Sequence, residues 1–224
     1  MTKDYEVYNH KTLREIIYDD LKSQILRGKL IPGTRLMELD LSKKMGASRT
    51  PIREALKMLA EDNLVAIEPN KGAYVSKISL RDLLEIIEIR ESMDGSTSYH
   101  AAERITENLK EKLNQAMLNY NKAALAQNQN DMIKWDTIFH SIIVEATGNQ
   151  VMIQIAEQIR ELVLRFRYLY YGDFERCTNV EAEHKKIYDA IMAKDAQKAE
   201  EAAQIHIKNI RKDIIRAYEN HGGF

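Results

Sequence analysis

The sequence predicts a mostly α-helical protein, in which three helices and a β-hairpin precede an antiparallel bundle of six helices. Three observations support this fold class. The 224 residues include only three prolines and nine glycines, whereas residues that favour helices are abundant. Apolar residues recur at helical spacing along most of the chain. Two short β-like runs occur together, before residue 78, and they mark the end of a first domain.

The first domain, residues 1–78, is predicted to contain three helices and a hairpin. A glycine follows each of the first two helices at the position of a C-cap, and a Pro-Gly turn separates them. Residues 64–67 and 73–76 are β-like runs on either side of the turn sequence PNKG. The helices are expected at residues 11–27, 36–45 and 48–63. This order of elements is that of a winged helix-turn-helix.

The third helix begins with polar residues and a proline. Ser48 is a good N-cap, and Pro51 is tolerated because N–H groups of the first turn have no helical partner. A helix N-terminus presents free N–H groups and the positive end of its dipole, which suit a phosphate. Arg49 and Arg53 project from one side, and Thr50 can add a hydroxyl contact. This helix is therefore a candidate for reading double-stranded DNA.

Charge and spacing alone leave the DNA interpretation open. Residues 1–78 carry 14 Lys and Arg against 11 Asp and Glu, a small excess. The hairpin tip would place Lys71 near a phosphate or the minor groove, with Gly72 beside it. The two arginines of the third helix could equally be solvated charges that pair with Glu54 or Asp40.

The second domain, residues 79–224, is predicted to be all α. Ser79 is followed three residues later by Asp82, as in a capping box, so a helix begins there. Short links separate the helices that follow, which indicates an antiparallel bundle. The expected helices are residues 80–104, 106–127, 131–147, 149–171, 176–193 and 195–219.

Three histidines and an aspartate of this bundle form a candidate metal site. Asp136 and His140 are four residues apart on one helix face and can bind one ion. His184 and His206 lie equally far from Asp195, which is expected to cap the second helix of an antiparallel hairpin, so their side chains can meet at one level. One oxygen and three nitrogens suit Zn²⁺ or Ni²⁺. The alternative is three unrelated histidines.

Arg90 is a candidate for binding a small organic acid. It interrupts the apolar, inward stripe of the helix at residues 80–104, and a bidentate carboxylate is the natural partner of a buried guanidinium. An i,i+4 ion pair with Asp94 at the surface, or an internal salt bridge, would explain it nearly as well. Arg165 and Arg167 are weaker candidates, because arginines near helix ends are mostly solvated.

The first domain resembles a known family of bacterial transcription regulators. The segment SRTPIREAL, with PGTRLMELDLSKKMGA before it and LAEDNLVAIEPNKGAYV after it, is similar to the winged helix-turn-helix of the GntR family. The resemblance covers residues 11–78. It implies that Arg49, Thr50 and Arg53 contact operator DNA and that Gly72 lies at the wing tip.

The second domain resembles the helical ligand-binding domain of the fatty-acid-regulator branch of that family, the FCD domain. The resemblance covers residues 80–218. It implies a metal site formed by Asp136, His140, His184 and His206, and an effector carboxylate held at Arg90. Together the two resemblances imply a homodimeric regulator whose affinity for DNA changes when a metal and a small carboxylate bind.

Composition restricts the cellular setting and leaves two other functions to consider. Cys177 is the single cysteine, and no apolar run approaches the length of a membrane span. With a polar N-terminus, these features predict a cytoplasmic protein without membrane contact.

Two other functions are considered. A metalloenzyme is disfavoured because the best candidate for a general base, Glu183, would point away from the metal. An interaction protein with a purely structural metal is the third possibility.

Overall fold

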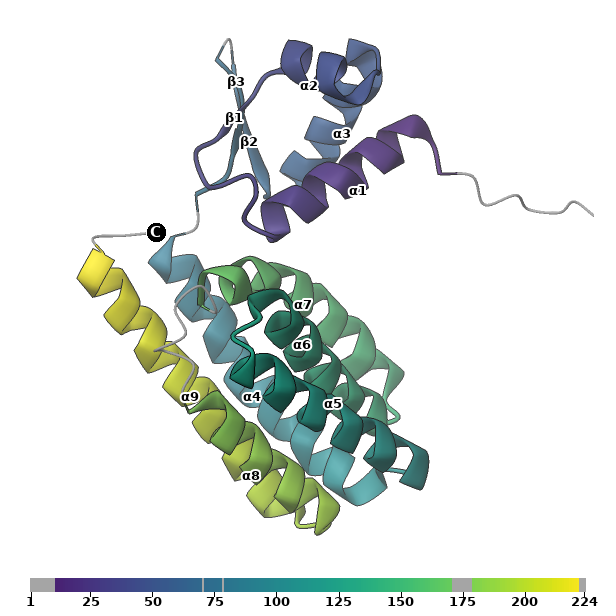
Figure 1. Ribbon diagram of the computed structural model, residues 1–224, viewed down its shortest axis with the longest axis vertical. Helices are drawn as coiled ribbons and strands as arrows, with labels where there is room; N and C mark the ends of the chain where they lie inside the picture. Colours follow the sequence, from purple (N-terminus) through teal and green to yellow (C-terminus); the bar gives the residue numbers. More distant parts are fainter. Residues whose placement is uncertain (1–10, 70, 78, 171–178, 222–224) are drawn as a thin grey trace, which may run out of the picture. The chain divides into compact units, whose positions relative to one another are not determined.

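The computed structural model describes residues 11–69, 71–77, 79–170 and 179–221, without the side chains of residues 161–170, 217, 220 and 221. The chain divides into two compact units, Met1–Lys77 and Ile78–Phe224. Helices predominate, and the described strands all belong to the first unit (Figure 1). The predicted fold class, mostly α with a small antiparallel sheet near the N-terminus, is therefore confirmed.

The first unit contains the predicted helices and hairpin, and one strand that the sequence did not predict. Its elements are α1 (Leu13–Leu26), β1 (Arg35–Leu36), α2 (Glu38–Met45), α3 (Arg49–Glu61), β2 (Val65–Glu68) and β3 (Gly72–Val75). The strands form an antiparallel sheet in the order β1-β3-β2. Because β1 is only two residues long, it shows no alternation of polar and apolar residues and could not be recognised from the sequence.

The core of the first unit lies between α1 and α3. Ile17 and Leu21 of α1 are almost completely buried, as are Ile52 and Leu59 of α3. Burial of each such side chain stabilises the fold by roughly 1.5–3 kcal/mol. Since the apolar face of α3 is used in this way, its polar N-terminal residues remain outside the core.

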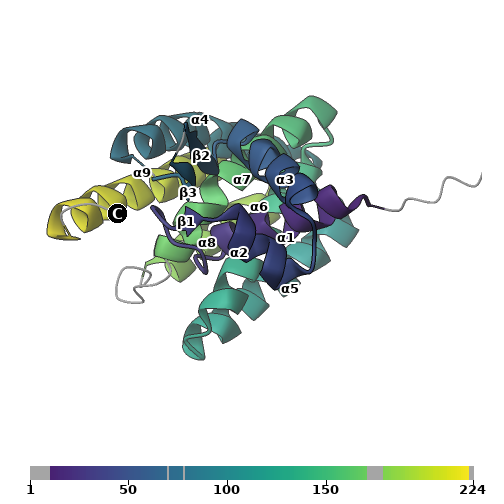
Figure 2. The same ribbon diagram turned by 90° about the horizontal axis from the view of Figure 1, so that it is seen from above.

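The second unit is a helical bundle organised around α4. Its helices are α4 (Leu80–Arg104), α5 (Glu107–Leu125), α6 (Gln129–Ala146), α7 (Gln150–Tyr170), α8 (Val180–Met192) and α9 (Ala196–His221). Helix α4 packs against α6, α7, α8 and α9. Helices α4 and α9 lie side by side in Figure 1 and again in the turned view of Figure 2. The absence of a side chain at Gly95 brings α4 close to Gln204 of α9.

Capping residues fix where the helices of the bundle begin. Ser79 Oγ accepts a hydrogen bond from the N–H of Asp82 at 3.0 Å, as the sequence predicted. Asp195 likewise caps α9, accepting from the N–H of Lys198 at 3.1 Å. The resulting tight turn makes α8 and α9 an antiparallel hairpin, which brings His184 opposite His206. Among the described helices, none has the length and apolar character needed to cross a membrane.

Candidate functional site

The structure brings together the three histidines that the sequence singled out. His140 comes from α6, His184 from α8 and His206 from α9, and one ring nitrogen of each lies within 4.8 Å of the others. His184 and His206 are each 1% exposed. Three imidazoles in mutual contact, two of them buried, are costly to bring together without a shared ligand, so this cluster fits a bound metal ion.

Asp136 faces the same cluster from α6. Its Oδ1 atom lies 3.4 Å from His184 Nε2 and 3.7 Å from His140 Nε2. The carboxylate is 4% exposed. A carboxylate that approaches two imidazole nitrogens at these distances can join them in binding one cation. The four predicted ligands are therefore adjacent in space, although their role as ligands stays a prediction.

Glu183 orients His206, a contact that the sequence did not reveal. Glu183 Oε2 lies 2.7 Å from His206 Nδ1, and Glu183 Oε1 accepts a hydrogen bond from Asn209 Nδ2 at 2.7 Å. His206 Nε2 is buried and has no hydrogen-bond partner among the described residues. A carboxylate bound to one ring nitrogen fixes the orientation of the other, as in carboxylate–histidine–metal arrangements.

The contact between Glu183 and His206 could be inferred only once the packing of α8 against α9 was known. Glu183 precedes His184, and Asn209 follows His206 by three residues, so both lie on helix faces that meet across the α8–α9 contact. From its position in the sequence, Glu183 is only a candidate general base that points away from the metal. It does face His206 rather than the space between the imidazoles, and its carboxylate is already used in two hydrogen bonds.

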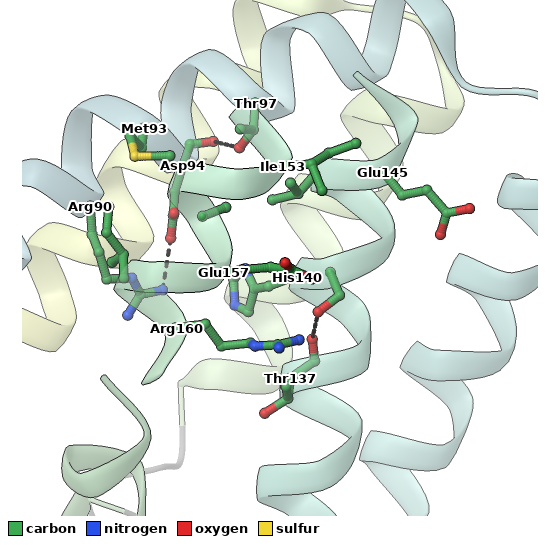
Figure 3. A pocket seen from close by; sticks show the side chains of 14 residues that line it. Arg90, Met93, Asp94, Thr97, Thr137, His140, Glu145, Ile153, Glu157 and Arg160 are labelled. Carbon is green, nitrogen blue, oxygen red and sulfur yellow. Dashed lines mark hydrogen bonds and ion pairs between the residues drawn. The ribbon is translucent and has the colours of Figure 1, made fainter. Parts of the chain in front are cut away.

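A cavity of about 300 Å³ lies beside the histidine cluster, between α4, α6 and α7. His140 lines it, so the cavity and the cluster share one side chain (Figure 3). Each helix contributes residues spaced three or four apart, as a single helix face does. Its lining residues are Arg90, Met93, Asp94, Thr97, Thr137, His140, Ser141, Val144, Glu145, Ile153, Ala156, Glu157, Ile159 and Arg160.

Arg90 lies in the wall of this cavity and is paired. Only 6% of it is exposed, and Nη2 donates to Asp94 Oδ2 at 2.7 Å. The structure thus shows the ion pair that the sequence analysis left open, inside the bundle rather than at its surface. Arg165 and Arg167 belong to the part of α7 whose side chains are outside the described residues. Arg160, which the sequence analysis did not consider, lines the cavity instead.

The N-terminal turn of α3 is exposed, as a nucleic-acid interface requires. Ser48, Arg49 and Thr50 are exposed, whereas Pro51 is partly covered. Ser48 occupies the N-cap position, but its hydroxyl makes no capping hydrogen bond. The hydroxyl and the first N–H groups of α3 are therefore both available to a phosphate.

Arg53 forms an ion pair with a partner that the sequence did not predict. Its Nε and Nη2 atoms donate to the two carboxylate oxygens of Glu38 on α2 at 2.8 and 2.7 Å. Arg53 is thus an exposed, ion-paired charge, but its partner is Glu38 rather than Glu54, which lies 3.8 Å from Arg14. The hydrogen bond from Arg53 lowers the pKa of Glu38 below its ordinary value.

The hairpin tip is shaped by a glycine and held by an arginine. Gly72 has φ of +108°, a conformation that other residues adopt with strain. Arg35 Nη2 donates to the carbonyl of Lys71 at 2.7 Å, which links β1 to the tip. The Lys71 ammonium is exposed and lies 3.1 Å from Glu68.

Two compact units of this kind define a class: one has an exposed helix N-terminus and a wing, and the other is a helical bundle with a cavity. They are the parts of a DNA-binding transcription regulator with a separate helical domain. Family models match both parts: the model of bacterial regulatory proteins of the gntR family matches residues 13–75, and that of the FCD domain matches residues 85–209. The chain belongs to the GntR family and carries an FCD domain.

Relatives and solved structures agree with this family. The chain is 27% identical to the HTH-type transcriptional repressor RspR of Escherichia coli, over 96% of this chain and 94% of the relative. It is 30% identical to the Uxu operon regulator of Haemophilus influenzae, over 87% and 79% respectively. The structure of E. coli McbR/YncC has a TM-score of 0.77 at 22% identity, covering 93% of this chain and all of that one. The two relatives are named as a repressor and an operon regulator, and the family consists of regulatory proteins, so the metalloenzyme interpretation is set aside.

Proposed function

We propose that this transcription regulator changes its affinity for operator DNA when a divalent metal and a small organic acid bind to its helical domain. The observation that supports this most directly is the position of His140. It belongs to the histidine cluster and also lines the cavity, so a ligand in the cavity would lie next to the metal.

In this proposal the residues divide by unit. Residues 1–78 bind DNA through Ser48, Arg49, Thr50, Pro51 and Arg53 of α3, with Lys71 and Gly72 in the wing. Residues 79–224 hold the metal, for which three imidazoles and a carboxylate favour Zn²⁺ or Ni²⁺. A bound ion of this kind can accept a ligand oxygen at a free coordination position. The ligands are Asp136, His140, His184 and His206.

The regulator acts as a cytoplasmic homodimer, since helix-turn-helix proteins of this kind commonly bind two half-sites. Each protomer supplies one winged domain. Metal and effector then act by changing the relative placement of the two winged domains, which alters how well they match the spacing of the half-sites.

The test is an affinity measurement with full-length protein. An operator is first selected from random duplex DNA, and its Kd is measured with zinc, with a chelator, and with zinc plus organic acids. We expect the Kd to change by roughly 5–150-fold between ligand states, the usual size of such coupling. A Kd that is the same in every state would reject the proposal. If zinc raises the Tm while acids change neither Tm nor Kd, the metal is purely structural.

A further inference from the structure

The small sheet of the first unit has a core face and a solvent face. In the antiparallel register, Arg35 of β1 lies opposite Tyr74 of β3, and Leu36 lies opposite Ala73. Leu36 and Ala73 are buried, whereas Arg35 is exposed. Because successive residues of a strand point to opposite faces of a sheet, the Arg35 side chain projects from the solvent face.

The Arg35 guanidinium is held against the tip of the wing, the hairpin formed by β2 and β3. Its Nη2 atom donates to the carbonyl of Lys71 at 2.7 Å, and the Tyr74 hydroxyl donates to the same carbonyl at 3.2 Å. Arg35 Cζ lies 5.9 Å from the centre of the Tyr74 ring. A Cβ atom at Gly72 would lie 3.7 Å from Arg35 Nε, so the guanidinium also lies against this glycine. A side chain held in this way loses less conformational entropy when it binds a ligand.

The positive charge of Arg35 is not balanced by an acid. Arg35 forms no ion pair with any residue that the structure describes. The Tyr74 ring attracts the cation without neutralising it. The hydrogen bond to Lys71 uses one N–H of the guanidinium, and the rest of the fork remains available to an anion.

Lys71, the cation that the sequence places at the wing tip, is already paired. Its Nζ atom lies 3.1 Å from Glu68 Oε2, and the hydrogen bond to this carboxylate raises the pKa of Lys71. A phosphate that approached the Lys71 ammonium would compete with Glu68 and would be repelled by it. The Lys71 carbonyl has a different role, because it accepts the hydrogen bond that places Arg35.

We infer that Arg35 makes the contact between the wing and the DNA backbone, and that Lys71 acts mainly through the carbonyl that positions Arg35. A guanidinium can bind a phosphate through two parallel N–H groups, which the point charge of an ammonium cannot reproduce. This inference rests on the proposed DNA binding by residues 1–78 and assigns the backbone contact of the wing to a residue of β1. Spacing along the chain does not reveal it, since Arg35 and Lys71 are 36 positions apart.

The test measures the affinity of full-length variants for a selected operator at several salt concentrations. Arg35→Gln removes the charge but keeps an amide N–H that can donate to the Lys71 carbonyl. It should weaken binding and lower the slope of log K against log salt by about 1, the effect of one lost phosphate contact. Arg35→Lys keeps the charge, so it should keep the wild-type slope. Lys71→Gln should also keep that slope.

Arg27→Gln is the matched control, because Arg27 is an exposed arginine at the end of α1, outside both α3 and the wing. Its affinity and slope should equal those of wild type. The inference is overturned if Arg35→Gln keeps the wild-type slope, or if Lys71→Gln lowers the slope by about 1. It is also overturned if Arg35→Lys loses as much slope as Arg35→Gln, since Arg35 would then act only by shaping the sheet.

The wild-type measurement separates these outcomes from a failure of the proposed function. Each overturning result above is obtained with an operator that wild-type protein binds, so it leaves DNA binding by the first unit standing. By contrast, if wild-type protein selects no operator from random duplex DNA, the proposed function itself fails, and this inference fails with it.

Discussion

His206 is the residue at which metal binding depends most clearly on a second side chain. Its Nδ1 atom is bound to Glu183, and its Nε2 atom is buried without a hydrogen bond among the described residues. Replacing Glu183 by Ala should weaken zinc binding by about 10–100-fold, because the imidazole loses the contact that orients it. Isothermal titration calorimetry with zinc measures this change.

Two further variants distinguish the loss of His206 orientation from a general loss of structure. Glu183→Gln keeps an oxygen that can accept from Nδ1, so it should bind zinc more tightly than Glu183→Ala. Glu181→Ala removes an exposed acid from the same helix and should bind like wild type. Equal losses in all three proteins would show that Glu183 does not act through His206.

Arg49 is the exposed cation at the N-terminus of α3. Arg49→Ala should weaken DNA binding and reduce the slope of log K against log salt by about 1, the expected effect of one lost phosphate contact. Fluorescence anisotropy at several salt concentrations measures the slope. The control is Lys57→Ala, an exposed cation farther along α3. Arg49 would have no part in the interface if its replacement left both affinity and slope at the control values.

Helices α2 and α3 are joined at the surface by the Glu38–Arg53 pair. Because the folded-state pKa of Glu38 is lowered by Arg53, the pair stabilises the fold above the unfolded-state pKa of about 4.3. That stabilisation is lost as the pH falls through the lower, folded-state value. Its contribution is small, because water and salt screen two side chains that are 59% and 33% exposed.

The corresponding measurement is denaturant unfolding between pH 6 and 3, roughly spanning that titration. Wild-type protein should lose more unfolding free energy across this range than Glu38→Gln, whose side chain does not titrate. The unfolding free energies of the two proteins should converge at the acidic end of this pH range. Parallel pH profiles would show that the pair contributes nothing to the joining of α2 and α3.

At the level of elements, the sequence predicts best what is set locally. Helix starts at Ser79 and Asp195 follow from capping groups whose partners are three residues away. The contact between His184 and His206 is predicted equally well, because a tight turn between two antiparallel helices fixes which of their residues lie at the same level. Strand β1 has no such local signal and depends on pairing with a strand far along the chain.

Contacts between helices that are not hairpin neighbours escape sequence reasoning. Arg160 reaches the cavity because of the rotation of α7 relative to α4 and α6, which periodicity within α7 does not determine. The partner of Arg53 was missed for a related reason, since Glu38 lies on another helix and nearer acids fit the spacing equally well. Sequence patterns thus identified a face of each helix, and packing decided which faces meet.

At the scale of the whole molecule, the chain consists of two compact units with separate cores. The candidate metal ligands all belong to the second unit, so zinc should stabilise that unit and leave the first unchanged. Differential scanning calorimetry of full-length protein should show two transitions. Zinc at about 100 times its Kd should stabilise one of them by about 2.7 kcal/mol, and a chelator should reverse the shift.

His184→Ala should abolish the zinc-induced shift and retain the transition of the first unit, because residues 11–69 form their core without any histidine of the cluster. A single transition that moves as a whole with zinc would show instead that the two units unfold together, and metal binding would then be coupled energetically to the DNA-binding unit even without an effector.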